Sequence, residues 1–189
     1  MTSKMFGATL LLLSGLTSIA HAASAGPAES ASAIVNYREY TTSFASSGQL
    51  AGHHLEPLKK QGFQRIVYLA YRAHGNAPDT LSIDQQATDL GLSYVHIPVP
   101  WQSPSQSDYQ TFAAVMRAQP AMKTLLHCQM NYRASAFSFL YRVLELGTPM
   151  QEALRDLNQI WSPDKTWMTF INTVLAAHDR PMVDIQQQS

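Results

Sequence analysis

The sequence has almost no cysteine: Cys128 is the only one among 189 residues. One cysteine excludes an internal disulfide and a zinc site built on several thiolates. The histidines do not compensate, because the sequence neighbours His53 and His54 do not share one face of a helix. We therefore expect no metal and no other cofactor.

Net charge is also lacking, since 13 basic and 13 acidic side chains give a formal charge of zero. A neutral chain creates no long-range field that would attract nucleic acid or an anionic membrane. We therefore predict no nucleic-acid partner. A content of 46% hydrophobic and 14% charged residues is instead typical of one compact domain.

Long apolar runs are scarce as well. The run at residues 7–19 is shorter than the roughly 20 residues of a membrane-spanning helix. Lys4 precedes this run and Ala20-His21-Ala22 follows it, which predicts a cleaved signal peptide at residues 1–22. We expect a periplasmic or secreted protein with no stable membrane insertion after cleavage. Residues 23–33 are predicted to form a flexible lead-in, residues 34–180 the domain and residues 181–189 a frayed tail.

A lone thiol outside the cytoplasm needs an explanation, because exported proteins usually pair their cysteines. One explanation is a buried and inert core cysteine. The other is a reactive cysteine, which depends on what surrounds Cys128.

The rest of the chain alternates between strand and helix patterns. We predict strands at residues 34–40, 63–69, 94–97 and 123–127, with a turn at 46–49 and a strand end at Pro98. Helices are predicted at residues 55–61, between Ser82 and Gly91, from Ser107 to 118, and at 133–146, 149–159 and 163–177, the last two capped by Thr148 and Ser162. Such alternation predicts a single α/β domain with a mostly parallel sheet flanked by helices. Ligands of such sheets bind at the carboxyl ends of the strands, here after residues 69, 97 and 127.

The loop after the last predicted strand reads His127-Cys128-Gln129-Met130-Asn131-Tyr132-Arg133. A tight loop that enters a helix can turn its backbone N–H groups inward as an anion-binding nest. Arg133 adds a planar fork that can bind two oxygens at once. We expect Cys128 to be a reactive thiolate in this positive field.

This loop resembles that of the cysteine-dependent protein tyrosine and dual-specificity phosphatases. The resemblance is closer to a small bacterial branch, the phosphatase-like domain of beta-lactamase-hydrolase-like proteins. It extends to residues 46–49, 62–69 and 94–99, and covers about residues 37–170. The resemblance implies a phosphatase-type fold with a central sheet of four or five strands. It also implies that Cys128 forms a thiophosphate intermediate while Arg133 holds the phosphoryl oxygens of a phosphorylated or other anionic substrate.

Two departures from the common phosphatase loop concern its shape. Four residues rather than five separate Cys128 from Arg133, as in the bacterial branch, and rhodanese-type sulfurtransferases have a loop of similar size. A tighter loop makes a smaller cradle, which suits a persulfide sulfur better than a tetrahedral phosphoryl group. Asn131 replaces the expected glycine, and Asn tolerates the positive φ that such a turn requires.

The third departure is a missing general acid. Phosphatases of this kind carry an Asp about thirty residues before the cysteine, and the segment Pro98-Val99-Pro100-Trp101-Gln102 contains none. Asp79 and Asp108 are the nearest alternatives, although Asp108 also suits an ordinary position in the first turn of a helix. Ser135 is a candidate neighbour of the thiol, and His127 is expected to support the loop by hydrogen bonds. Trp101, Tyr132 and Tyr71 are candidate walls of the pocket.

Three functions remain open at this point. The first is an exported cysteine-dependent phosphatase. The second is a rhodanese-type sulfurtransferase that carries a persulfide on Cys128. The third is a catalytically silent module that binds anions, which the missing acid favours.

Overall fold

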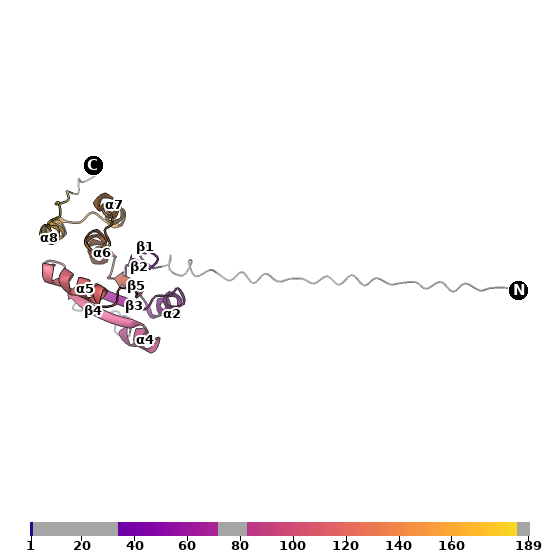
Figure 1. The fold of residues 1–189 in the computed structure, drawn as a ribbon. Coiled ribbons are helices and arrows are strands. Elements are labelled where there is room, and N and C mark those ends of the chain that lie inside the picture. Colours follow the sequence, from indigo (N-terminus) through magenta and orange to yellow (C-terminus); the bar gives the residue numbers. More distant parts are fainter. Residues whose placement is uncertain (2–33, 72–82, 185–189) are drawn as a thin grey trace.

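The computed structural model describes residue 1, residues 34–71 and residues 83–184 (Figure 1). Apart from Met1, the predicted signal peptide and lead-in lie outside the described residues, and so do Asp79 and Ser82. The elements are, in chain order, β1 (Arg38–Thr41), β2 (Phe44–Ser47), α2 (Gly52–Lys60), β3 (Arg65–Ala70), α4 (Ile83–Asp89), β4 (Ser93–Val99), α5 (Gln106–Ala118), β5 (Thr124–His127), α6 (Tyr132–Leu144), α7 (Met150–Ile160) and α8 (Lys165–Ala176).

The five strands form one sheet in the order β1-β2-β5-β3-β4. The pairs β2–β5, β5–β3 and β3–β4 are parallel, and only β1 runs antiparallel to its neighbour. This confirms the predicted single α/β domain with a mostly parallel sheet. In register, Tyr68 of β3 pairs with His127 of β5 and with His96 of β4. The carboxyl ends of these three strands therefore meet at one edge of the sheet.

Helices cover both faces of the sheet (Figure 1). On one face Leu55 and Leu58 of α2 and Ile83 of α4 pack with Ile66 and Leu125 of the sheet. On the other face α5 and α6 pack against the sheet, with α7 and α8 outside them. Because successive strand residues point to opposite faces, Leu125 and the next residue enter different cores. Strands buried on both faces carry continuous apolar runs, which explains why the central strands were recognisable from the sequence.

Three predicted strand features were wrong. Ser46 and Ser47 lie in β2 rather than in a turn, and this strand is fully buried between β1 and β5. Serine is tolerated there because Tyr40 and Ser46 share a hydroxyl–hydroxyl hydrogen bond of 2.8 Å. The strand predicted at residues 34–40 is shorter and begins at Arg38. The strand β4 does not stop at Pro98 but continues to Val99, because an exposed proline can occupy an edge strand.

Three predicted helix caps were also wrong. The N-cap of α5 is Ser105, not Ser107, and its hydroxyl accepts from the N–H of Asp108. The N-cap of α7 is Pro149 rather than Thr148. In α8 the N-cap is Asp164 rather than Ser162, and its carboxylate accepts from the N–H of Trp167 at 3.0 Å. In α5 and α8 the residue that reaches the free N–H groups two or three positions ahead decides the cap.

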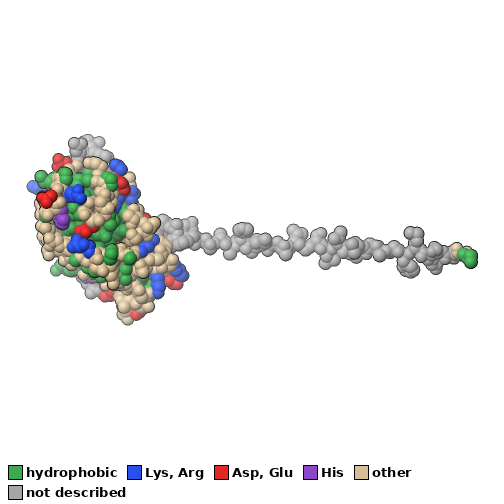
Figure 2. All heavy atoms as spheres, viewed as in Figure 1, with side chains coloured by type: hydrophobic (Ala, Val, Ile, Leu, Met, Phe, Trp, Pro, Cys, Tyr) green, Lys and Arg blue, Asp and Glu red, His purple; other side chains and the backbone are tan. Residues whose placement is uncertain are grey.

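Charges of both signs are interspersed on the face of the molecule shown in Figure 2, in keeping with the formal charge of zero. Among the described residues, no helix is both long enough and apolar enough to cross a bilayer.

Candidate active site

The loop of Cys128 connects the carboxyl end of β5 to the start of α6 at the shared sheet edge. Cys128 is only 1% exposed, but it lines a cavity of about 300 Å³ together with Trp101, Gln129, Met130, Tyr132 and Arg133. Asn131 is the N-cap of α6 and has φ 68°, so the predicted left-handed turn without glycine is confirmed. Loop and helix start thus meet in one pocket.

Hydrogen bonds from two distant segments fix the backbone of the loop on the side away from the cavity. The carbonyl of Gln129 accepts from the N–H of Gln49 at 2.8 Å, and that of Met130 accepts from Asn36 Nδ2 at 2.9 Å. Among the described residues, no acceptor contacts the N–H groups of Gln129, Met130, Tyr132 or Arg133. The first N–H groups of a helix have no acceptor within the helix, so those of Tyr132 and Arg133 remain available. Outward carbonyls and free N–H groups are the arrangement of an anion nest.

Arg133 is 7% exposed and is held on two sides. Its Nε donates to the carbonyl of Val99 at the end of β4, with an N–O distance of 3.0 Å. Its guanidinium carbon lies 5.1 Å from the ring centroid of Trp101. No carboxylate of the described residues lies within ion-pair distance of it. Its terminal nitrogens therefore have no carboxylate partner among the described residues, and the Cys128 side chain interacts with the guanidinium by charge attraction and a hydrogen bond.

The charge state of Arg133 reflects these surroundings. Burial lowers the pKa of its guanidinium below the usual range, whereas attraction to Cys128 and to Tyr68 opposes that shift. Neighbours that favour the charged form are negative or can become so. A bound anion would act in the same direction and stabilise the buried cation.

His127 lies directly behind the thiol and is 1% exposed. Its ring stacks on that of Tyr68 at 4.7 Å, and Tyr68 stacks on His96 at 5.0 Å. The ring nitrogens of His127 have no partner by distance and angle among the described residues, whereas a backbone hydrogen bond from Cys128 is among the influences on the ring. The expected support of the loop by His127 stays a prediction. Burial lowers the pKa of His127 to about 3, the adjacent Cys128 backbone opposes the shift, and repulsion from His96 adds to it. The ring is therefore neutral at ordinary pH.

Aromatic side chains wall the pocket on the helical side. Trp101 and Tyr132 line it as expected, whereas Tyr71 is 45% exposed and does not. Tyr132 stacks on Trp161 with the ring centroids 4.8 Å apart. Ser135 donates to the carbonyl of Tyr132 at 3.0 Å and accepts from Trp161 Nε1 at 3.1 Å. Its hydroxyl thus joins the aromatic wall rather than the thiol.

Neither of the two candidate general acids, Asp79 and Asp108, is among the described residues that line the cavity of Cys128. The carboxylate of Asp108 accepts from both the N–H and the hydroxyl of Ser105 at 2.8 Å, as part of a capping box. Asp108 does not line the cavity of Cys128. Its catalytic role stays a prediction, as does that of Asp79, which lies outside the described residues. Among the residues that do line this cavity, none is a carboxylate.

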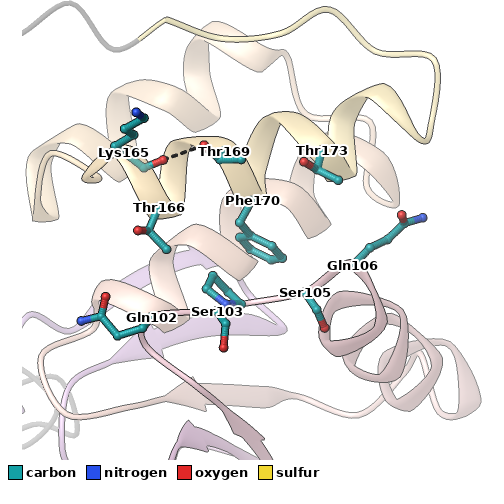
Figure 3. Close-up of a pocket in the computed structure, with 10 residues that line it drawn as sticks. Gln102, Ser103, Ser105, Gln106, Lys165, Thr166, Thr169, Phe170 and Thr173 are labelled. Carbon is teal, nitrogen blue, oxygen red and sulfur yellow. Dashed lines mark hydrogen bonds between the residues drawn. The ribbon is translucent and has the colours of Figure 1, made fainter.

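A larger cavity of about 410 Å³ lies between residues 102–106 and α8 (Figure 3). Figure 3 shows Phe170 pointing toward the loop, while the side chains of Ser103 and Ser105 point away from α8. No cysteine, histidine or carboxylate lines it. Within the described parts of the chain, no three His, Cys, Asp or Glu side chains gather in a possible metal site. Unlike this cavity, the smaller one at Cys128 is lined by a thiol and a buried guanidinium.

The supporting residues of the loop were missed by sequence reasoning. Asn36, Ser47, Gly48 and Gln49 all contact residues 128–131 through hydrogen bonds or a β-bridge. Of these, the segment 46–49 was predicted as a turn and carries part of the resemblance to the family, but its contact with the loop was not predicted. Contacts over 80 or more positions leave no local signal in a single sequence.

Comparisons with known proteins agree with this geometry. The family model described as beta-lactamase hydrolase-like protein, phosphatase-like domain, matches residues 36–142, more than half of the chain. No curated protein matches the sequence.

Three solved structures illustrate the similarity. A candidate phosphatase (DUF442) from Shewanella putrefaciens CN-32 is 28% identical, with a TM-score of 0.69 over 79% of this chain and 97% of that one. A cysteine-to-serine variant of TpbA from P. aeruginosa, in complex with phosphotyrosine, is 11% identical with a TM-score of 0.59, covering 82% and 94%. The core catalytic domain of the PP-IP phosphatase SIW14 from S. cerevisiae, in complex with citrate, is 11% identical with a TM-score of 0.59, covering 72% and 83%. The last two likenesses concern the fold alone.

Proposed function

The chain belongs to the family of the phosphatase-like domain of beta-lactamase hydrolase-like proteins, and from this premise we propose that it is a cysteine-dependent phosphatase. In this reaction the thiolate of Cys128 attacks phosphorus, and an S–P bond forms as the ester P–O bond breaks. Water then attacks the thiophosphate, releasing inorganic phosphate and regenerating the thiolate. Covalent catalysis of this kind divides one difficult step into two easier ones.

One observation carries the proposal: the buried guanidinium of Arg133 has no carboxylate partner among the described residues and lies in the same cavity as Cys128. A buried charge without a partner is costly. Its terminal nitrogens and the free N–H groups of the loop would offset that cost by binding a phosphoryl group. The same groups would stabilise the charge that develops on the oxygens during transfer.

The ligands of related structures support an anionic substrate. The TpbA variant binds phosphotyrosine and the SIW14 domain binds citrate. Both ligands are anions with several negatively charged oxygens. By analogy we propose a phosphorylated or otherwise anionic small molecule or side chain as the partner of Arg133.

The missing acid narrows the substrates on which turnover would be fast. A positioned general acid contributes about 10²–10⁴ in rate when the leaving group needs a proton. The segment after β4 supplies Trp101 at the cavity, and Asp108 caps α5 instead. We therefore propose faster turnover for esters whose leaving group is already a stable anion.

Sulfur transfer is the second candidate. The four-residue spacing between Cys128 and Arg133 favours it, and so does the lining of the cavity, which includes no carboxylate of the described residues. A thiolate that accepts a sulfane sulfur from thiosulfate becomes a persulfide and releases sulfite, with no proton donor required. The same nest would stabilise this second anion.

Export is part of the proposal. The pattern of residues 1–22 is that of a secretory signal peptide, and we place the mature protein in the periplasm or outside the cell. Cys128 would there have no other cysteine of the chain to pair with.

The decisive experiment compares the mature protein and Cys128→Ser in two assays, 4-nitrophenyl phosphate hydrolysis and sulfur transfer from thiosulfate to cyanide. We expect hydrolysis by the wild type and none by the variant. Turnover of thiosulfate alone would replace the phosphatase by the sulfurtransferase. Activity in neither assay, together with Arg133-dependent binding of phosphate, would identify a silent binding module.

A further inference from the structure

Two asparagine residues bind each other's chain segments across 95 positions of sequence. The side chain of Asn36 donates from Nδ2 to the carbonyl of Met130 at 2.9 Å. The side chain of Asn131 donates from Nδ2 to the carbonyl of Asn36 at 2.6 Å. We call this reciprocal pair of hydrogen bonds the Asn36–Asn131 clasp. It joins the segment before β1 to the loop that carries Cys128.

Both residues of the clasp have left-handed backbone conformations. Asn36 has φ 49° and Asn131 has φ 68°, and the described chain has only one other non-glycine residue of this kind, Asp179. Asn131 is fully buried, and its Oδ1 has no hydrogen-bond partner among the described residues. A buried left-handed residue with an unsatisfied oxygen is a poor choice for stability alone. Glycine would provide the same turn without that cost.

The clasp packs against a third segment, residues 48–49, where a side chain larger than that of glycine would not fit. A Cβ on Gly48 would come within 2.8 Å of the Gln129 carbonyl oxygen and 2.9 Å of Val35 Cβ. The N–H of Gly48 donates to Val35 at 2.6 Å, and that of Gln49 donates to Gln129 at 2.8 Å. Residues 35–36, 48–49 and 129–131 therefore form one tightly bonded layer behind the anion nest.

We propose that Asn36 and Asn131 are positioning residues, which hold the backbone of residues 129–131 so that its N–H groups face the anion. The bond from Asn36 fixes the carbonyl of Met130, and with it the peptide that lies between the free N–H groups of Met130 and Tyr132. Asn131 thus supplies the turn and the bond, whereas glycine would supply only the turn. The inference rests on the proposed function, because the anion is taken to be the phosphoryl group.

The single cysteine permits a test that needs no turnover. Iodoacetate and iodoacetamide both alkylate Cys128, but only iodoacetate carries an anion into the nest. The ratio of the two rate constants, relative to that of free cysteine, measures how well the loop attracts an anion. Unfolded molecules react as free cysteine and lower the ratio, so each variant is alkylated under conditions in which its urea unfolding curve shows only folded protein.

The variants are Asn36→Gly, Asn131→Gly and their combination, since glycine keeps both left-handed turns without strain. We expect each single variant to lower the ratio about three- to tenfold, the effect of one net hydrogen bond. The double variant should have the same ratio as the single variant with the lower ratio. Both bonds join the same two segments, so their effects should not add. Asn36→Asp keeps the shape, cannot donate to Met130 and adds a negative charge, so its ratio should fall at least as far as that of Asn36→Gly.

Asn172→Ala is the matched control, because Asn172 also makes two bonds to a distant backbone, with Val183, but belongs to α8 and does not line the cavity of Cys128. Its ratio should equal that of the wild type. An unchanged ratio in folded Asn36→Asp and Asn131→Gly would overturn the clasp and leave the phosphatase proposal standing. A wild-type ratio no higher than that of free cysteine would overturn the anion nest itself, and the clasp with it.

Discussion

Arg133 and Arg142 lie nine residues apart on the same helix and are both buried, yet their surroundings are opposite. Arg142 is paired with Asp156 at 2.6 Å and with Glu152 at 3.2 Å, and it lies over the ring of Tyr40. Arg133 also lies over an aromatic ring, that of Trp101, but among the described residues it meets no carboxylate. The fold supplies the counter-ions of one arginine and leaves those of the other to a ligand.

This difference separates a structural arginine from a functional one. Asp156 also binds Arg38, so the pairs around Arg142 connect β1, α6 and α7. A buried ion pair with several partners holds elements together and is damaging to break. An unpaired buried cation costs stability instead. Its place beside Cys128 is what the proposed binding of an anion requires.

The largest expected effect comes from exchanging each arginine for lysine. Arg133→Lys should lower kcat/KM for 4-nitrophenyl phosphate about 10²–10³-fold, because lysine keeps the charge but loses the planar fork. Arg142→Lys, made in the same way, should change it by less than about threefold, given that Arg142 does not line the cavity. Equal losses in the two variants would mean that Arg133 acts only through the fold.

Removing each charge should affect stability in the opposite order to activity, with the larger loss at Arg142. Arg142→Met should reduce the free energy of unfolding by about 2–3 kcal/mol, because it breaks a buried ion pair. The loss should be at the lower end for such a pair, since Glu152 is half exposed and Asp156 remains paired with Arg38. Arg133→Met should leave stability unchanged or raise it by about 1 kcal/mol. Urea unfolding of both variants measures the contrast. A loss of similar size in Arg133→Met would show that its charge has a partner after all.

The loop and the central strands could be predicted from the sequence because their signals are local. A strand, a short loop and a helix start follow one another within residues 123–133, so the nest needed no tertiary information. Strands β3 and β5 are apolar on both faces, which is typical of buried parallel strands. The fold class and the placement of Cys128 beside Arg133 follow from such patterns.

The remainder depends on contacts that a single sequence does not display. β2 was mistaken for a turn, because Ser46 and Ser47 have a turn-like composition and are stabilised in the sheet by neighbours on both sides. The role of Asn36 in supporting the loop could not be predicted, since its partner Asn131 lies 95 positions away. Ser135 has a residue type suited to the thiol but is bound to Trp161 by the packing of α6 against α7. Each case is an override of local preference by tertiary structure.

His127 extends the comparison to a third buried polar group, which has no counter-ion among the described residues. Its pKa is lowered to about 3, so the folded state binds fewer protons than the unfolded state between that pH and about 6.5. Stability should therefore be complete above about pH 6.5 and fall with pH below it, by about 1.4 kcal/mol per unit.

The matching variant is His127→Phe, which keeps a ring to stack on Tyr68 and removes the titration. Between pH 7 and pH 5 its free energy of unfolding should fall about 2 kcal/mol less than that of the wild type. The same pH dependence in both proteins would mean that His127 finds a proton acceptor when the chain is folded. Chemical unfolding at a series of pH values gives both curves.

The smallest expected effect is that of Asp108→Asn, and it bears on the absent acid. The carboxylate of Asp108 accepts two bonds from Ser105, one of them from its N–H, so an amide in its place should cost about 1 kcal/mol of stability as a weakened cap.

A general acid has a different signature, because it accelerates the departure of an alkyl alcohol and hardly affects that of 4-nitrophenol. We expect Asp108→Asn to leave the ratio of kcat/KM for these two kinds of ester unchanged, with Ser105→Ala as the control that weakens the same cap. A selective loss on the alkyl ester in Asp108→Asn alone would make Asp108 the acid, and the capping box would then be a resting position from which its carboxylate must move. An unchanged ratio leaves phosphoryl transfer dependent on Cys128, Arg133 and the nest, which confines fast turnover to esters that need no proton on departure.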